Sequence, residues 1–430
     1  MPRSGICAPF TIPPNRRDDM HARVSLTVPV PLTNISAVRK YRRRLMETSN
    51  QFSRSLFVAI AMFCLGVGLA GASEVWKWSG SYGDDSVELL IIGDIQVQQR
   101  SDPTSAFIHV TDTLNHADLV YANLEGMLVE SKGYGVDIHD KKWIHPGPQG
   151  VVALKSANVD VVGVANNVAY GRDNILETLR VLDEGGIAHV GAGTDIEEAH
   201  RPVILERKGV TIGFLQYTAR WYRQDEQIAT ATEAGVARLM SRDGVTIHPA
   251  DLERVQNDIR KLRPRVDVIV VSQHNRDGAT PMQFGPTPDK PRSQRDRTQA
   301  EEYQKQFAHI ALDTGADLVF GHGTHTLQGV ELYKGKPILY ALGHSAFDQP
   351  GYEKATDGLF VRVVISGKKI VRVSFVPVTR DENNNVLMLD PAKGEGDRLV
   401  QLVKGVSDLP LKIQGQEVVL LDESARPTEQ

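Results

Sequence analysis

The chain has few cysteines and no surplus of positive charge. Only Cys7 and Cys64 are present, and both lie within the first 72 residues. Without that segment the protein can form neither a disulfide nor a thiolate metal site, so a bound metal must use imidazole, carboxylate or amide ligands. The same segment holds 10 of the 49 Lys/Arg and 3 of the 53 Asp/Glu, which leaves 39 basic and 50 acidic residues and a net charge of −11. This balance argues against nucleic-acid binding, because phosphate backbones are held by surplus cationic charge.

The apolar run near the N-terminus is short for a membrane span. The uncharged run Leu56–Ala72 has 17 residues, whereas a spanning helix needs about 20. Arg54 precedes the run and three small residues end it, which is the pattern of a secretory signal peptide. We therefore expect cleavage after Ala72 and a periplasmic or extracellular protein. The alternative is that residues 56–72 are retained and anchor the chain to the inner membrane.

The composition changes along the chain and suggests four parts. Residues 1–45 are rich in Arg and Pro and lack apolar periodicity. Signal peptides rarely carry so long a leader, so we expect translation to start at Met46. The predicted parts are a leader and signal peptide over 1–72, a linker over 73–87, one domain over 88–380, and a peripheral C-terminal extension over 381–430 with one weak helix.

Apolar runs alternate with helical segments over the middle of the chain. The run VELLIIGD (87–94) is apolar almost throughout, as in strands whose two faces are both covered. The segment 172–186 has its apolar residues on one face and glycines past its end, which predicts a helix. Two β-rich runs around Lys208-Gly209 predict a hairpin. This pattern predicts an α/β fold, a mixed β-sandwich flanked by helices. The other expected helices are 105–117, 148–157, 251–263 and 301–315.

Several predicted strands end in residue types that bind metals. Ligands of open α/β sheets collect at the carboxyl ends of strands. Each residue also has a plainer interpretation, since an Asp can cap the next helix, an Asn pair can form a turn, and a lone His can be a rim residue. Their repetition favours a site for one or two divalent cations, which by ligand type are Mn, Fe, Zn or Mg. The residues concerned are Asp94, Glu125, Asn166, Asn167, His274, His322 and His325.

Six motifs carry a resemblance to a known family. In chain order they are GDI (93–95), NLE (123–125), ANN (165–167), QH (273–274), GHGTH (321–325) and TLQGVELYKGKPILYALG (326–343). This series resembles the bacterial capsule-synthesis CapA family over about residues 88–380. The resemblance implies a metallophosphatase-like fold with four α-β-β-α layers, and an association with poly-γ-glutamate or related anionic exopolymers.

The resemblance also implies roles for the metal-binding residues. One metal would be held by Asp94 and His325, and Glu125 would bridge to a second metal. The ligands of that second metal would be Asn167, His274 and His322.

Three positions depart from the family pattern. Val168 stands where the family has a His after its Asn pair, which removes a general acid for the leaving group. Gln96 stands where metallophosphatases have the His of their Asp-x-His opening. His344 occupies the Asn position of a Gly-Asn-Phe motif and could replace the missing acid or a ligand, although its plainer and favoured interpretation is a rim histidine. The candidate catalytic residues are His344 and Asn166.

Two functions fit these residues. The first is an exported hydrolase that uses metal-activated water to cut a phosphoester or amide bond in an anionic capsule polymer or a small anionic substrate. The second is a non-catalytic protein that binds the polymer or supports a membrane synthase complex through a degenerate metal site. A nucleotidase-like phosphatase is disfavoured by Val168. In the hydrolase hypothesis, substrate charge would be neutralised by Arg220, Arg223, Arg276 or a loop arginine such as Arg295. The plainer and favoured interpretation of these arginines is solvated loop charge.

Overall fold

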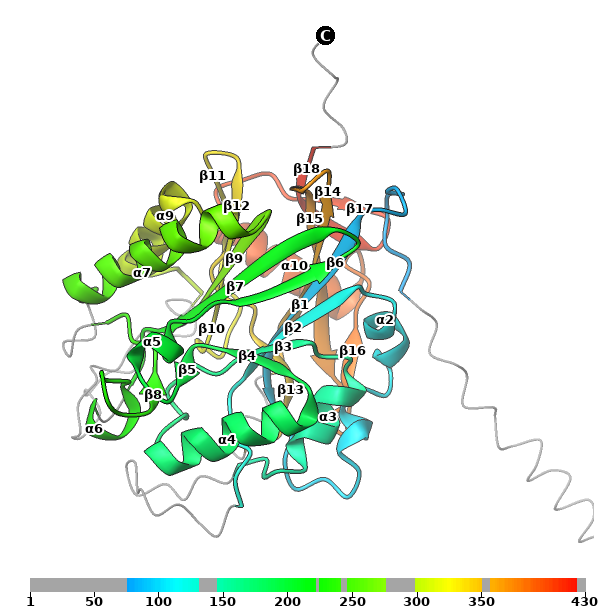
Figure 1. Cartoon of the computed structure of the whole chain (residues 1–430). Helices are drawn as coiled ribbons and strands as arrows, with labels where there is room; N and C mark the ends of the chain where they lie inside the picture. Colours follow the sequence, from blue (N-terminus) through cyan, green and yellow to red (C-terminus); the bar gives the residue numbers. More distant parts are fainter. Residues whose placement is uncertain are drawn as a thin grey trace, which may run out of the picture. The chain divides into compact units, whose positions relative to one another are not determined.

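Two β-sheets form the centre of the protein (Figure 1). The structure is a computed structural model, and it describes residues 76–130, 145–221, 224–240, 246–275, 298–349 and 356–423. The larger sheet has the strand order β17-β18-β15-β14-β1-β2-β3-β4, with β13 paired to β1 and β16 paired to β15. Its strands are β1 (Val87–Gln96), β2 (Leu119–Leu124), β3 (Val161–Gly163), β4 (Ala188–Val190), β13 (His344–Phe347), β14 (Gly358–Ser366), β15 (Lys369–Arg380), β16 (Val386–Met388), β17 (Lys412–Gln414) and β18 (Glu417–Asp422).

The smaller sheet has the order β11-β12-β10-β9-β7-β6. Its central strands β7, β9 and β10 are parallel, and two hairpins form its edges, the predicted one as β6–β7 and another as β11–β12. A separate pair of short strands is formed by β5 (Ala192–Gly193) and β8 (Gly235–Val236). The strands of the smaller sheet are β6 (Val203–Arg207), β7 (Val210–Thr218), β9 (Val268–His274), β10 (Leu318–His322), β11 (Val330–Tyr333) and β12 (Lys336–Leu339).

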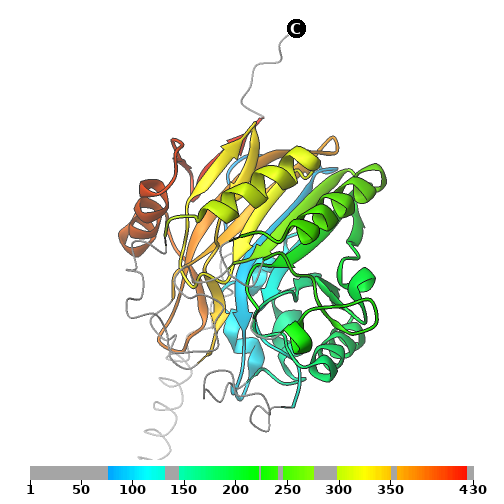
Figure 2. The ribbon, with the colours of Figure 1, turned by 90° about the vertical axis from the view of Figure 1, so that its left-hand side faces the viewer.

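Helices cover the outer face of each sheet. Figure 2 shows α7 and α9 side by side over the smaller sheet, and the larger sheet packs against η1, α2, α3 and α4. The described helices are η1 (Pro103–Phe107), α2 (Thr111–Asn115), α3 (Gly150–Ser156), α4 (Arg172–Gly185), α5 (Ile196–Ala199), α6 (Gln224–Gln227), α7 (Pro249–Leu262), η2 (Arg263–Arg265), α9 (Glu302–Thr314) and α10 (Gly394–Gly405).

The apolar pattern of β1 explains the layers. Leu89 and Ile91 face the core between the two sheets, whereas Leu90 and Ile92 face the core under the helices. Because side chains alternate along a strand, a continuous apolar run has two faces to bury. The second outer core lies between the smaller sheet and the pair α7 and α9. The predicted α/β fold, a β-sandwich flanked by helices in four layers, is confirmed.

Two segments differ from the sequence prediction. The helix expected over 105–117 is divided into η1 and α2, since Val110 between them has ψ −4° and the stretch is rich in β-branched residues, which are poor helix formers. Residues 381–430 were expected to be peripheral, but β18 pairs with β15 and extends the larger sheet. An isolated six-residue run gives no local sign of its distant partner strand.

Buried charges join β18 to the segment before β1, part of the predicted linker. Glu417 is fully buried and accepts hydrogen bonds from the Ser79 backbone N–H at 2.8 Å and from Arg372 at 2.9 Å. Arg362 lies 3.9 Å from Glu417 and donates to the Ser79 carbonyl. Its guanidinium also lies 5.5 Å from the ring of Trp78. These contacts fix the described part of the linker, 76–86, against the C-terminal strands.

None of the described helices is long and apolar enough to cross a membrane. The run Leu56–Ala72, the start at Met46 and the predicted cleavage point lie outside the described residues.

Candidate metal centre

The carboxyl ends of strands from both sheets meet at one site. Strand register places Asp94 beside Asn123 and His344 in the larger sheet, and His274 beside His322 in the smaller one. Glu125 directly follows β2. All six side chains are buried. Parallel strands bring their carboxyl ends to one edge of a sheet, which explains why residues far apart in the chain converge here. His344 is the exception, since it is the first residue of β13 and reaches this edge because β13 continues beside the end of β1.

Three of these side chains, together with His325 from the loop after β10, could hold one metal ion. Asp94, Glu125, His325 and His344 each offer a ligand atom, and these atoms all lie within 4.8 Å of one another. The Nε2 of His325 lies 3.6 Å from the Oε1 of Glu125, and its Nδ1 lies 2.8 Å from the Nε2 of His344. His344, a candidate catalytic residue from the sequence, therefore belongs to the same cluster as three predicted ligands.

The remaining predicted ligands lie next to this cluster. The Nε2 of His274 lies 2.7 Å from the Oδ1 of Asn167 and 4.0 Å from the Oε1 of Glu125. The Nδ1 of His322 lies 3.6 Å from the Oδ1 of Asp94. The two carboxylates thus approach both groups of histidines. The assignment of particular residues to two separate ions stays a prediction.

Burial decides the charge of this site. It raises the pKa of Asp94 to about 6, and hydrogen bonding with Glu125, Asn123 and Gly323 opposes that rise. Burial lowers the pKa of His322 to about 3 and that of His274 well below its usual value. Both imidazoles are therefore neutral at pH 7, with ring nitrogens able to bind a cation.

The donor set fits a divalent cation. Neither ring nitrogen of His322 has a hydrogen-bond partner among the described residues, although the side chain is fully buried. Gln96 stands where metallophosphatases have the His of their Asp-x-His opening. Its Oε1 is also buried and has no hydrogen-bond partner among the described residues. An unpaired buried polar group costs about 1–3 kcal/mol, so these atoms need a ligand. Carboxylates and neutral imidazoles together suit Mn, Fe or Zn.

Asn123 organises the centre, although it was not among the residues predicted to bind the metal or act in catalysis. Its Nδ2 donates to the Oδ1 of Asp94 at 2.8 Å and lies 3.4 Å from the Nδ1 of His274. Its Oδ1 accepts a hydrogen bond from the Nε2 of Gln216 at 2.8 Å. The position of Asn123 at a strand end was a usable signal. Gln216 could not be recognised from the sequence as a supporting residue, because it lies inside the apolar strand β7.

The loop after β10 needs glycine to reach the centre. Gly323 has φ +81°, and a Cβ at this position would lie 2.5 Å from the Nε2 of His274. Its backbone N–H donates to the Oδ2 of Asp94 at 3.3 Å. His325, two residues later, also has a positive φ of +56°. A non-glycine residue in this conformation is strained, and such strain is typical of functional sites.

Asn166 has a structural use in the loop that carries Asn167. Its Nδ2 donates to the carbonyl of Leu124 at 2.7 Å, and its Oδ1 accepts from the backbone N–H groups of Val168 and Ala169 at 3.1 and 3.0 Å. These bonds occupy its amide, and no described contact joins it to the cluster. Its catalytic role stays a prediction.

One of the four predicted arginines can be placed. The positive charge of Arg220 contributes to the lowered pKa of His274, after burial and the neighbouring His322. Arg220 therefore lies near enough to act electrostatically on the centre. Arg223, Arg276 and Arg295 lie outside the described residues.

Comparison with known proteins gives a family match and curated relatives. Residues 82–349 match the model of the bacterial capsule synthesis protein family PGA_cap. The chain is 27% identical over 322 residues to the PGA biosynthesis protein CapA of Bacillus subtilis, covering 72% of this chain and 75% of that protein. It is 25% identical over 315 residues to the capsule biosynthesis protein CapA of Bacillus anthracis, covering 70% of this chain and 69% of that protein.

Two further similarities are more distant. A probable polyglutamine synthesis accessory protein of Mycobacterium tuberculosis is 29% identical over 215 residues, covering 47% of this chain and 49% of that protein. A crystal structure of a phosphatase from Mycoplasma pneumoniae aligns with a TM-score of 0.40 at 13% identity, covering 70% of this chain and 96% of that one.

Proposed function

The chain belongs to the bacterial capsule synthesis protein family PGA_cap, and we propose that it is an exported, metal-dependent hydrolase that acts on an anionic capsule polymer or during its synthesis. The observation that supports hydrolysis is the centre in which two carboxylates lie close to several histidines, and in which the buried His322 has no hydrogen-bond partner among the described residues. The relatives named for PGA and capsule biosynthesis support the polymer. The run Leu56–Ala72 supports export.

Each residue of the centre has a role in the proposed hydrolysis. Asp94, Glu125 and the histidines would hold a divalent cation, which supplies Lewis-acid activation of water and of an anionic substrate oxygen. Arg220 would attract the negative charge of the substrate, since its field already reaches His274. Val168 cannot give a proton to a leaving group. His344, a member of the cluster in contact with His325, is the imidazole that would take this role if the other side chains hold the ion.

A second function is favoured by the same departures. Val168 and Gln96 weaken the catalytic set, and the Mycobacterium relative is named as an accessory protein. The alternative is therefore a polymer-binding protein that supports a membrane synthase and keeps metal for structure alone.

Metal content and turnover separate these functions. The full chain would be purified, its bound metal measured, and its activity tested on a chromogenic phosphodiester and on poly-γ-glutamate. The His322→Ala/His325→Ala variant should lose metal and turnover, whereas a His109→Ala/His116→Ala control, which changes two exposed histidines, should keep both. Metal without turnover would favour the accessory role. Equal metal content in all three proteins would show that the centre is assigned to the wrong residues.

A further inference from the structure

A polar pocket lies beside the metal centre at the same edge of the larger sheet. It has a volume of about 510 Å³, within the range of small-ligand sites. Strands β1 and β13 lead to both features, since Asp94 and His344 belong to the centre while Gln98 and Asp348, four residues further along and just past each strand, line the pocket. One extended polymer could occupy both.

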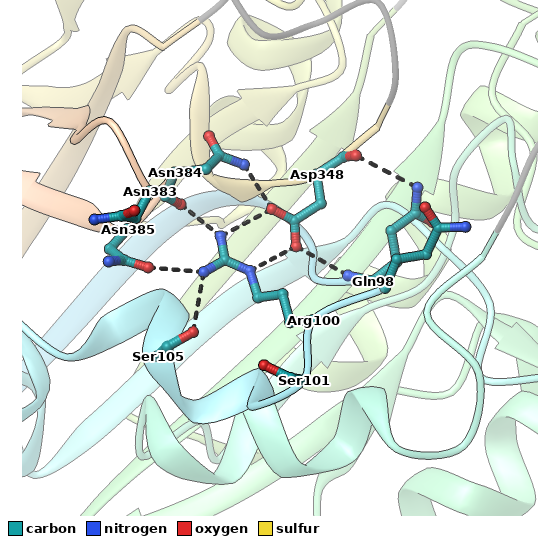
Figure 3. Close-up of a pocket in the computed structure, with 9 residues that line it drawn as sticks. Gln98, Arg100, Ser101, Ser105, Asp348, Asn383, Asn384 and Asn385 are labelled. Carbon is teal, nitrogen blue, oxygen red and sulfur yellow. Dashed lines mark hydrogen bonds and ion pairs between the residues drawn. The ribbon is translucent and has the colours of Figure 1, made fainter.

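The single arginine of the pocket has no free hydrogen-bond donor. Arg100 donates from Nε and Nη2 to the two carboxylate oxygens of Asp348, both at 2.8 Å (Figure 3). Its other N–H groups donate to Ser105 at 3.2 Å, to the Oδ1 of Asn385 at 2.7 Å and to the carbonyl of Asn384 at 2.6 Å. A guanidinium has five N–H donors. All five are used inside the protein, so Arg100 holds the wall of the pocket together.

The pocket is therefore electrically neutral. Arg100 and Asp348 are the only charged residues among the nine that line it, and they form a two-pronged ion pair with side chains about a tenth exposed. Among these nine described residues a carboxylate ligand would find no free cation, and it would lie close to the negative charge of Asp348. A site for a polyanion needs unpaired cationic groups, which these lining residues do not provide.

The exposed part of the wall consists of amides and a hydroxyl. Gln99, Ser101 and Asn383 are exposed, and their side chains have no hydrogen bond among the described residues. Figure 3 shows Ser101 with no dashed line to a neighbour. Gln99 and Asn384 have positive φ values of +56° and +63°, conformations that cost energy, and the Asn384 carbonyl accepts a hydrogen bond from Arg100. Amides and hydroxyls both donate and accept hydrogen bonds, as sugar hydroxyls require.

We propose that this pocket binds an uncharged, hydroxyl-rich unit, a sugar residue of an exopolymer, beside the metal centre. The inference rests on the proposed function for its biological role, because the polymer would extend from the pocket to the hydrolytic centre. Binding of the sugar unit itself depends only on the residues that line the pocket and not on hydrolysis at the metal centre. A substrate that carries sugar units would then be favoured over a simple chain of carboxylates.

Binding of defined oligomers to the full chain tests this inference. Neutral tetrasaccharides built from glucose, galactose or N-acetylglucosamine, a γ-glutamyl tetramer and inorganic phosphate would each be titrated calorimetrically, with EDTA present so that the result does not depend on metal. At least one neutral tetrasaccharide should bind. The Ser101→Ala/Asn383→Ala variant should weaken its binding about tenfold, since two neutral hydrogen bonds are lost. Asn257→Ala, which changes an exposed amide on α7, is the matched control and should bind normally.

A second variant tests the charge argument. Asp348→Asn removes the anion and releases the Arg100 guanidinium, so affinity for the γ-glutamyl tetramer should rise by roughly tenfold. The inference is overturned if no neutral tetrasaccharide binds, if Ser101→Ala/Asn383→Ala binds as wild type does, or if Asp348→Asn gains no affinity for the anion. If a neutral tetrasaccharide binds but the wild-type protein turns over neither the phosphodiester nor poly-γ-glutamate, the proposed function is contradicted and this inference is not.

Discussion

The Nδ1 of His325 lies 2.8 Å from the Nε2 of His344, so one imidazole orients the other inside the candidate metal centre. His344 comes from β13, which pairs with β1 next to Asp94, whereas His325 comes from the loop after β10. His344 in turn stacks on Phe347, with ring centroids 4.1 Å apart. The pair therefore joins the ends of both sheets at the site.

His344→Asn, which restores the residue that the family resemblance places there, should weaken metal binding. Whether His344 binds the ion or only orients His325, the expected loss of affinity is about 10- to 100-fold. Calorimetric titration with Mn²⁺ or Zn²⁺ would measure it, with the exposed His116→Asn as the control. Unchanged affinity in His344→Asn would exclude both roles.

Asn123→Ala should destabilise the protein even without metal. The substitution leaves the buried Nε2 of Gln216 and the Oδ1 of Asp94 without their partner. Unpaired buried groups of this kind cost about 1–3 kcal/mol each, so we expect a loss of about 2–4 kcal/mol in the free energy of unfolding. Urea denaturation in EDTA would show it. Asn257→Ala should change stability by less than about 0.5 kcal/mol, and an equal effect of both substitutions would contradict the network.

His145 should make stability depend on pH. Burial lowers its pKa to about 3, and its Nδ1 accepts a hydrogen bond from the backbone N–H of Met127 at 3.0 Å. In the unfolded chain the pKa is about 6.5. Between these values only the unfolded state binds the proton, so the stability contributed by His145 is present above pH 6.5 and is lost as the pH falls toward 3.

The variant His145→Asn should remove this pH dependence. Asn can still accept the Met127 hydrogen bond but does not titrate. The fall in unfolding free energy from pH 7 to pH 5 should be smaller in the variant by about 2 kcal/mol. Urea denaturation at the two pH values gives the comparison. Equal falls in wild type and variant would mean that His145 is solvated or charged in the folded protein.

Glu417→Gln should destabilise the junction between β18 and the segment before β1. Arg372 would lose its buried charge partner, and Arg362 a nearby compensating charge. Breaking one side of a buried ion pair typically costs about 3–5 kcal/mol. Glu395→Gln, which breaks an ion pair with Arg398 on the surface, should cost less than about 1 kcal/mol. A small effect of Glu417→Gln in urea denaturation would show that the charges are not essential to this junction.

Much of the fold was predictable because its signals are local. The apolar run of β1 and the one-sided helix α4 are visible in short windows, since strand and helix periods are properties of adjacent residues. The split of residues 105–117 into η1 and α2 was not predictable. The β-branched residues there weaken the preference for helix, and tertiary packing then decides whether the helix is continuous. The pairing of β18 with β15 was also hidden, since a short strand does not specify its partner.

The sequence by itself determined which residue types stand at the strand ends, from Asp94 to His325, because each follows an apolar run whose end is locally marked. Only the tertiary structure decided that His344 joins Asp94, Glu125 and His325, that Asn123 and Gln216 support them, and that Arg100 is fully paired beside them. These relationships join residues far apart in the chain, and the pairing of β1 with β13 and the packing of one sheet on the other create them.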